Sequence, residues 1–188
     1  MYNVIEVISL KKFYLIITII FVLSISISCK NKTNDTINKE DVKQNLEITY
    51  FYPTEDFIVL GKEDNAYLKI KSTIDGKDDK NFLSIVDNLQ NPTNLTNEKV
   101  YPSISKDIKI NSITLDNDVF IVDFDSKNLS GGSLDEEILI NSLVQTLLSI
   151  KNNSPLGKYV KFTVDNLQTQ SLFGHFQADK LYSLDNIK

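Results

Sequence analysis

The sequence predicts an α+β fold, a single small domain in which a mixed β-sheet carries two helices packed on one face. The first reason is size, since 188 residues with 41% hydrophobic and 24% charged side chains can bury one sizeable core but hardly two. The second is order, because apolar residues alternate or fall at helical spacing as strand, strand, helix, hairpin, helix, strand. The third is that no segment of roughly 20 to 50 residues repeats, which excludes a solenoid.

The predicted domain opens with strands. Residues from Leu46 to about Pro53 are rich in β-branched and aromatic side chains, which favours a strand, and a short second strand is predicted at Phe57 to Leu60. In Ala66 to Ile74 the apolar residues alternate with lysines, a pattern typical of a strand with one buried face. These segments predict the first part of the sheet.

Two helices are predicted from capping residues and apolar spacing. The first begins at Asp78 or Asp79, either of which can act as its N-cap, and ends before Pro92. Its apolar residues at helical spacing are Phe82, Ile85, Val86 and Leu89. The second begins at Ser133, which has capping-box spacing with Glu136, and its broad apolar face should pack across the sheet.

The remaining strands lie between and after the helices. In "DIKINSITLDNDVFIVDFD" two apolar runs flank Asp116-Asn117-Asp118, which predicts an antiparallel hairpin. Alternation from Tyr159 to Asp165 predicts a last central strand.

The N-terminal segment has the pattern of a targeting signal. Lys11 and Lys12 precede Phe13 to Ile27, an uncharged run of about fifteen residues, the length of a signal-peptide h-region and short for a membrane span. Ser26-Ile27-Ser28-Cys29 then resembles a bacterial lipobox, in which the signal peptide is removed just before a cysteine that carries lipid. Ser26 departs from that pattern, where leucine is usual.

We therefore predict signal cleavage between Ser28 and Cys29 and lipidation of Cys29, with acyl chains such as palmitate holding the protein at the membrane. Two alternatives remain for Cys29: an ordinary residue inside an uncleaved anchor helix, or the end of a secretory signal that receives no lipid. Glu6 lies upstream of the two lysines, where such signals avoid acids, so translation is predicted to start near Leu10.

Three segments follow from this pattern. Residues 1–28 are predicted to be a lipoprotein-type signal peptide. Residues 29–45 are predicted to be a lipidated, disordered linker, because their polar composition cannot bury enough surface to offset ordering entropy. Residues 46–188 form the predicted domain.

Composition excludes several classes of function. Every basic residue is a lysine and the net charge is −5. The chain therefore lacks arginine, whose guanidinium donates paired hydrogen bonds to phosphates and guanine edges. We predict no nucleic-acid partner. Cys29 and His175 are the only cysteine and histidine, which leaves too few soft ligands for a zinc centre. We predict no cofactor.

Four acids and one histidine are the candidate reactive groups, and each has a plain structural interpretation. Asp116, Asp118, Asp123 and Asp125 suggest calcium, but they lack the oxygen spacing of an EF-hand, so we predict a solvated turn and strand face and no metal site. His175 has no evident nucleophile or acid partner, so it is interpreted as a turn histidine bonded to backbone. No catalytic residue is predicted.

Two other features have a binding and a structural interpretation. Tyr50, Phe51 and Tyr52 could form an aromatic ligand platform, although alternate residues of a strand more often give one face to the core. Gly131 and Gly132 lack the spacing of a phosphate-binding loop and are interpreted as a flexible approach to the second helix.

Several stretches together follow the pattern of a known family. They are "ITYFYPTEDF", "FLSIVDNLQNP", "YPSISKDIKINSITLDNDVFIVDFDSKN", "DEEILINSLVQTLLSI", "VKFTVDN" and "FGHF". Through them the region from about Leu46 to Leu184 resembles the GerMN domain, the sporulation and spore germination module of bacterial envelope proteins. The departures are Asn91, where a glycine usually precedes Pro92, and Asn166, where a glycine commonly follows the last strand.

The resemblance implies a small module, similar to ring-building motifs, that makes protein contacts in the envelope and is often presented on a lipoprotein tether. It implies no catalytic residues. We therefore predict a non-enzymatic bacterial envelope lipoprotein, attached to the membrane through Cys29. Its domain contacts envelope proteins, including copies of itself, and a link to sporulation or germination is left open.

Two other functions remain alternatives. The first is a ligand-binding lipoprotein that recognises peptidoglycan or another small envelope molecule, with aromatic residues near Tyr50 or with His175 lining its pocket. The second is an envelope hydrolase, which needs an acid/base pair that the sequence does not display.

Overall fold

The computed structural model describes residues 45–76, 79–96 and 99–187, and its contacts separate a compact unit, residues 43–188, from residues 1–42. The predicted signal peptide, the cleavage site at Ser28 and Cys29, linker residues 29–44 and the cap at Asp78 lie outside the described residues. Asn45, predicted to end the linker, is instead the first residue of a strand, because it pairs with Asp75. Among the helices described, none is long and apolar enough to cross a membrane.

The first sheet is antiparallel and built around the first strand. It contains β1 (Asn45–Pro53), β2 (Tyr67–Asp75), β5 (Lys151–Asn152) and β6 (Ser154–Pro155), in the order β2-β1-β5-β6. β1 pairs with β2 along its whole length, and alternate residues of β1 are buried. The predicted strands at Leu46 and Ala66 are therefore confirmed.

The second sheet is mixed. It contains β3 (Ile110–Asp116), β4 (Val119–Phe124), β7 (Tyr159–Val164) and β8 (Leu167–Gln168), in the order β3-β4-β7-β8. β3 and β4 form the predicted antiparallel hairpin, and β4 pairs with β7 in parallel. β7 lies between β4 and β8, so the predicted strand is central as expected, but it is not the last, because β8 follows it along the chain.

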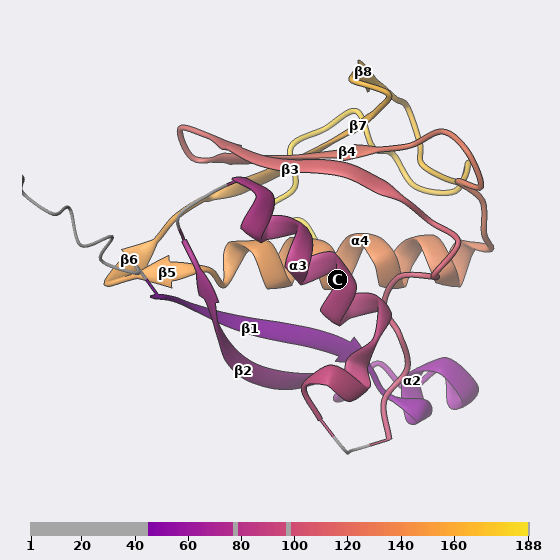
Figure 1. The fold of residues 1–188 in the computed structure, drawn as a ribbon. Helices are drawn as coiled ribbons and strands as arrows, with labels where there is room; N and C mark the ends of the chain where they lie inside the picture. Colours follow the sequence, from indigo (N-terminus) through magenta and orange to yellow (C-terminus); the bar gives the residue numbers. More distant parts are fainter. Residues whose placement is uncertain (1–44, 77–78, 97–98, 188) are drawn as a thin grey trace, which may run out of the picture. The chain divides into compact units, whose positions relative to one another are not determined.

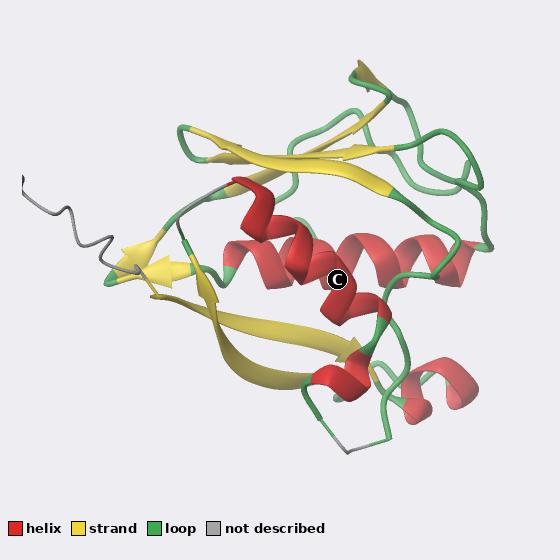
Figure 2. Ribbon diagram, viewed as in Figure 1, coloured by secondary structure: helices red, strands yellow, loops and turns green. Residues whose placement is uncertain are grey.

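Four helical segments join these strands: α2 (Glu55–Leu60), α3 (Asp79–Gln90), the 3₁₀ turn η1 (Pro92–Asn94) and α4 (Ser133–Leu148). Figures 1 and 2 show α3 and α4 between the two sheets, both on the same side of the mixed sheet. α3 contacts β3, whereas α4 contacts both β1 and β7. The α+β class is confirmed, and the mixed sheet has both helices on one face.

The expectation of a single sheet is corrected, because β1 and β2 belong to a separate sheet with β5 and β6. The physical reason lies in α4. Every residue from Ile138 to Val144 is buried, which covers the full circumference of the helix. A helix that is buried all round must be covered on more than one side, and here strands of both sheets contact it.

The predicted short strand at Phe57 to Leu60 is wrong, since these residues belong to α2. The side chain of Thr54 accepts a hydrogen bond from the Phe57 amide at 3.4 Å, and Gly61 ends the helix in the left-handed conformation at φ 64°. Acids in the first turn add a favourable interaction with the helix dipole. These end signals outweigh the β propensity of the residues between them.

The predicted start of α4 is displaced by one residue. Gly132 rather than Ser133 is the N-cap, and the Asp135 carboxylate accepts a hydrogen bond from the Gly132 amide at 2.8 Å. Glu136, predicted to close the capping box, is fully buried instead. The displacement matters because it frees Glu136 for another role.

Candidate interaction surface and ligand pocket

The Glu136 carboxylate holds the C-terminal segment against α4. Its two oxygens accept five hydrogen bonds of 2.8 to 3.2 Å. The donors are the Ser171 hydroxyl and the backbone amides of Leu172, Phe173, His175 and Phe176. A charged group buried in this way is stabilised because so many donors replace its water shell.

These hydrogen bonds also decide the ionisation of Glu136. Burial by itself would raise the pKa of the carboxyl, but the Phe173, His175 and Leu172 amides and the Ser171 hydroxyl outweigh burial, so the pKa lies below its usual value. Glu136 is therefore a structural anion. Sequence patterns could not predict this role, because the donors lie more than 30 residues further along the chain.

The four acids of the hairpin do not gather into a metal site. Asp116 is exposed at the hairpin turn, and Asp118 and Asp125 form surface ion pairs with Lys158 at 3.5 Å and Lys109 at 3.3 Å. Within the described residues no group of three or more cysteine, histidine or acidic side chains is placed to hold a metal ion. The solvated interpretation holds for these three acids.

Asp123 corrects that interpretation, because only 2% of it is exposed. Its carboxylate accepts hydrogen bonds from the Thr163 hydroxyl at 2.7 Å, the Asn166 amide at 2.6 Å and the Asn111 side chain at 3.0 Å. Burial tends to raise its pKa, but these three bonds outweigh burial and the pKa is lowered. Asp123 thus ties β4 to β7 and to the turn after β7.

The other predicted candidates are structural. Tyr50 and Tyr52 are fully buried and stack with ring centroids 6.2 Å apart, so the core interpretation is confirmed and the platform is not. Their hydroxyls both bond to Asn88 on α3, at 2.9 Å. His175 is exposed, and its ring nitrogen lies 3.4 Å from the Gly131 carbonyl oxygen, as expected of a turn histidine.

A groove of about 410 Å³ lies between α2 and the first half of α4, and we call it the α2–α4 groove. Apolar side chains dominate its lining, among them Ile58, Tyr101, Leu134, Ile138 and Phe173. On the same short helix, Val59 and Leu60 are 62% and 60% exposed. Neither of these two side chains lines the groove, to which α2 contributes Ile58. An apolar groove and exposed apolar side chains on one short helix are typical of a protein-contact surface.

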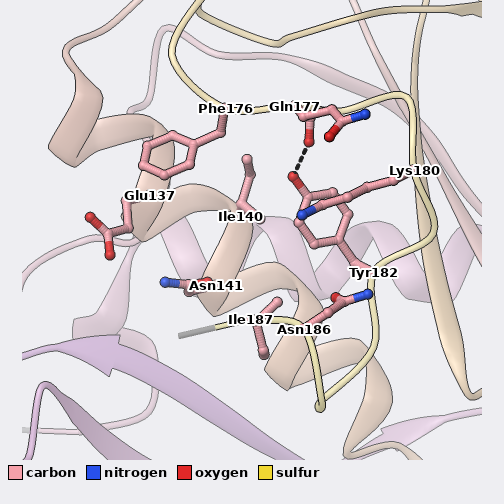
Figure 3. A pocket seen from close by; sticks show the side chains of 9 residues that line it. All are labelled: Glu137, Ile140, Asn141, Phe176, Gln177, Lys180, Tyr182, Asn186 and Ile187. Atoms are coloured by element: carbon pink, nitrogen blue, oxygen red, sulfur yellow. Dashed lines mark hydrogen bonds between the residues drawn. The ribbon is translucent and has the colours of Figure 1, made fainter.

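Two further pockets share two lining residues of α4, Glu137 and Asn141. The first, of about 180 Å³, lies between α4 and the C-terminal segment (Figure 3). There the Tyr182 hydroxyl donates a hydrogen bond to the Gln177 carbonyl, which closes a loop within the C-terminal segment. Burial raises the pKa of Tyr182 to about 12, with a further contribution from Glu136.

The second, which we call the acidic pocket, has a volume of about 520 Å³. Its lining is Phe57, Glu63, Asp64, Ala66, Tyr67, Glu137 and Asn141. Burial raises the pKa of Tyr67 to about 12, a hydrogen bond with the Asn141 side chain lowers it, and the charge of Glu137 adds to the rise. The phenol therefore stays protonated. Sequence reasoning missed this pocket, because its residues come from four separate segments.

The fold and these surfaces define a class: a small α+β module that presents an apolar groove and open pockets on one buried helix. The chain belongs to the Germane family, described as sporulation and spore germination, whose family model matches residues 49–170. This confirms the resemblance drawn from the sequence.

A solved structure has a similar fold, and a second aligns less well. A candidate lipoprotein from Clostridium perfringens aligns with a TM-score of 0.50 at 18% identity, covering 78% of this chain and 92% of that one. The tandem GerMN domains of the sporulation protein GerM from Bacillus subtilis align with a TM-score of 0.47 at 18% identity, covering 79% of this chain and 48% of that one. The chain thus spans about half of the tandem protein. The comparison with curated proteins gave no match.

Proposed function

We propose that this chain is a lipid-anchored bacterial envelope protein whose Germane domain binds protein rather than catalysing a reaction. Membership of a family described as sporulation and spore germination supports the envelope role. The observation that carries the binding role is the exposure of Val59 and Leu60, 62% and 60%, on the helix that forms one wall of the α2–α4 groove. Covering such side chains stabilises an assembly by removing apolar surface from water.

The partner that we propose is a second copy of the domain. Leu181 and Leu184, in the C-terminal segment, are 46% and 60% exposed and do not line the groove. A contact between such leucines and the groove of the next copy joins two different surfaces. A contact of this kind repeats from copy to copy and builds a ring or a filament.

Replacing Val59 and Leu60 together by serine is expected to weaken self-association of residues 43–188 by at least about tenfold, because contact area worth ~1.4 kcal/mol or more is lost. Sedimentation velocity over a concentration series measures it. Leu167→Ser is the matched control, since Leu167 is 70% exposed on β8, a strand that contributes no residue to the groove, whereas α2 contributes Ile58. A wild-type domain that stays strictly monomeric would contradict the proposal.

The lipid anchor has its own test at Cys29. Mass spectrometry of the mature chain is expected to find acyl groups on an N-terminal Cys29, and Cys29→Ser is expected to abolish acylation and move the protein out of the detergent phase. Ser26→Leu, which restores the commoner lipobox residue, should leave acylation intact. A mature chain that carries no acyl group, or that starts elsewhere, would overturn the anchor.

A further inference from the structure

The strand β2 is an edge strand, because the first sheet has the order β2-β1-β5-β6 and, among the described strands, only β1 pairs with it. The hydrogen bonds of β1 show which groups face the open side of β2. The amides of Thr49 and Phe51 donate to side-chain hydroxyls on α4, at 2.8 and 3.3 Å, and their carbonyl oxygens accept from serine side chains, so both point away from β2. Opposite residues in such an antiparallel pair point away from each other. The N–H and C=O groups of Lys71 and Lys69, and of Thr73 two residues further on, therefore face the open side.

Two lysines give this open edge a positive charge. Lys69 and Lys71 are exposed, and neither forms an ion pair with a described residue. The other lysine of this sheet, Lys151, is taken by Glu47 at 3.1 Å. The Lys69 ammonium lies 5.5 Å from the centroid of the Phe51 ring on β1, a contact that still leaves its charge unneutralised. The edge of β2 is therefore a positive site on a chain whose net charge is −5.

These lysines exclude one occupant of the edge and favour another. Lysine on an edge strand commonly prevents two copies of a protein from pairing edge to edge. A second β2, placed antiparallel about Ile70, would put Lys69 of each copy opposite Lys71 of the other, and like charges directly opposite destabilise a strand pair. A strand with carboxylates at those positions gains from the same lysines. The charge of the edge therefore selects an acidic strand against a second β2.

The residues between the lysines indicate what the other face of the partner strand meets. Leu68, Ile70 and Ser72 are half-buried, and Ile70 packs against the hydrophobic core. Successive side chains of a strand point to opposite faces of the sheet, so an added strand would place every second side chain beside these three. Apolar side chains at those positions would extend the core-facing side of the sheet. The edge thus fits a strand in which acidic and apolar residues alternate.

We propose that the open edge of β2 binds an extended segment of another protein in which acidic residues alternate with apolar ones. The segment adds a strand to the first sheet through main-chain hydrogen bonds with residues 69, 71 and 73. Its carboxylates lie opposite Lys69 and Lys71, and its apolar side chains lie beside Ile70. The proposal is independent of self-association, because β2 contributes no residue to the α2–α4 groove.

The probe is the peptide acetyl-TEVEVET-amide, titrated into ¹⁵N-labelled residues 43–188 at low ionic strength. This segment contains the whole described core, from Leu46 to Tyr182, so it should fold alone. The peptide is expected to shift the amide signals of residues 69, 71 and 73 in a saturable way and to slow their hydrogen exchange. Acetyl-TKVKVKT-amide, which has the opposite charge in the same pattern, should not. An equal response to the basic peptide, or no saturable response to the acidic one, would overturn the proposal and leave the lysines as protection of the edge only.

Charge reversal tests the side-chain part of the contact. Lys69→Glu combined with Lys71→Glu is expected to weaken binding of the acidic peptide by at least about tenfold, because two attractive cross-strand pairs become repulsive. The same variant should bind the basic peptide, which also shows that it is folded. Lys106→Glu combined with Lys127→Glu makes the same change of charge in exposed loops outside this sheet. If that control weakened the acidic peptide as much, general charge attraction would explain the binding and the edge would not be the site.

A proline substitution tests the main-chain part. Thr73→Pro removes an N–H group that faces the open side and keeps both lysines, and edge strands accept proline where the N–H faces solvent. Binding of the acidic peptide is expected to weaken by about threefold to tenfold, because one main-chain hydrogen bond is lost. Thr73→Ala keeps the N–H group and should bind as the wild type does, and matching melting temperatures show that both variants are folded. Equal binding by the two variants would show that the peptide does not add a strand to the sheet.

Discussion

Glu136→Gln is expected to lower the free energy of unfolding by about 3 kcal/mol and to release the C-terminal segment from α4. The substitution keeps the size of the side chain, so no cavity is made. One carboxylate oxygen becomes an NH₂ group, which faces either the His175 and Phe176 amides or the donors on the other side. Donors then oppose donors, and a buried amide that loses its acceptor loses a full hydrogen bond.

Urea denaturation measures the change in stability, and hydrogen exchange locates it. The amides of residues 172, 173, 175 and 176 should lose protection before the core strands do. Glu137→Gln is the matched control on the next residue of α4, where partial exposure predicts a change within about 0.5 kcal/mol. Equal stability of the two variants would show that the Glu136 hydrogen bonds contribute nothing.

Stability should also depend on pH through Glu136. Its folded pKa lies below the ordinary value of 4.5, so the folded state holds the proton less strongly than the unfolded state. The stabilisation is therefore fully present above about pH 4.5 and is lost as the pH falls through the folded pKa. In Glu136→Gln, the free energy of unfolding should depend less on pH in this acidic range. An unchanged pH dependence in the variant would show that Glu136 does not cause it.

Asp123→Ala is expected to cost about 2 to 4 kcal/mol, because it leaves the Thr163 hydroxyl and the Asn166 amide without their acceptor at a buried position. The change also frees the turn after β7, which that amide helps to close. Urea denaturation checks the magnitude. Asp116→Ala, at the exposed end of the same hairpin, should change stability by less than about 0.5 kcal/mol. A similar loss of stability in both variants would show that the effect comes from the local propensity of the hairpin and not from the Asp123 hydrogen bonds.

Much of the local structure was predictable from the sequence. Alternation along β1, β2 and β7 and the helical spacing in α3 and α4 all correspond to observed elements. The main failure was the strand predicted at Phe57 to Leu60, which is helical. At α2, a threonine cap and a closing glycine decided between helix and strand, and apolar content alone did not reveal them.

The candidate sites were less predictable. Asp123 looked like one acid among four on a solvated strand, and only the approach of Thr163 and Asn166 distinguishes it. The residues that line the acidic pocket lie on α2, in the loop before β2, on β2 and on α4, so no short sequence motif contains them. Tyr50 and Tyr52 were the exception, because strand periodicity correctly placed both in the core.

The sequence by itself determined the α+β class, the order of the elements, the family and the expectation of a lipid anchor, because these depend on local propensity, periodicity and motifs read along the chain. Only the tertiary structure decided that there are two sheets, that Glu136 is a buried structural anion, and which side chains share a pocket. Each of these depends on contacts between residues far apart in the sequence. Burial and unsatisfied hydrogen bonds take their energies from such contacts, which local pattern does not encode.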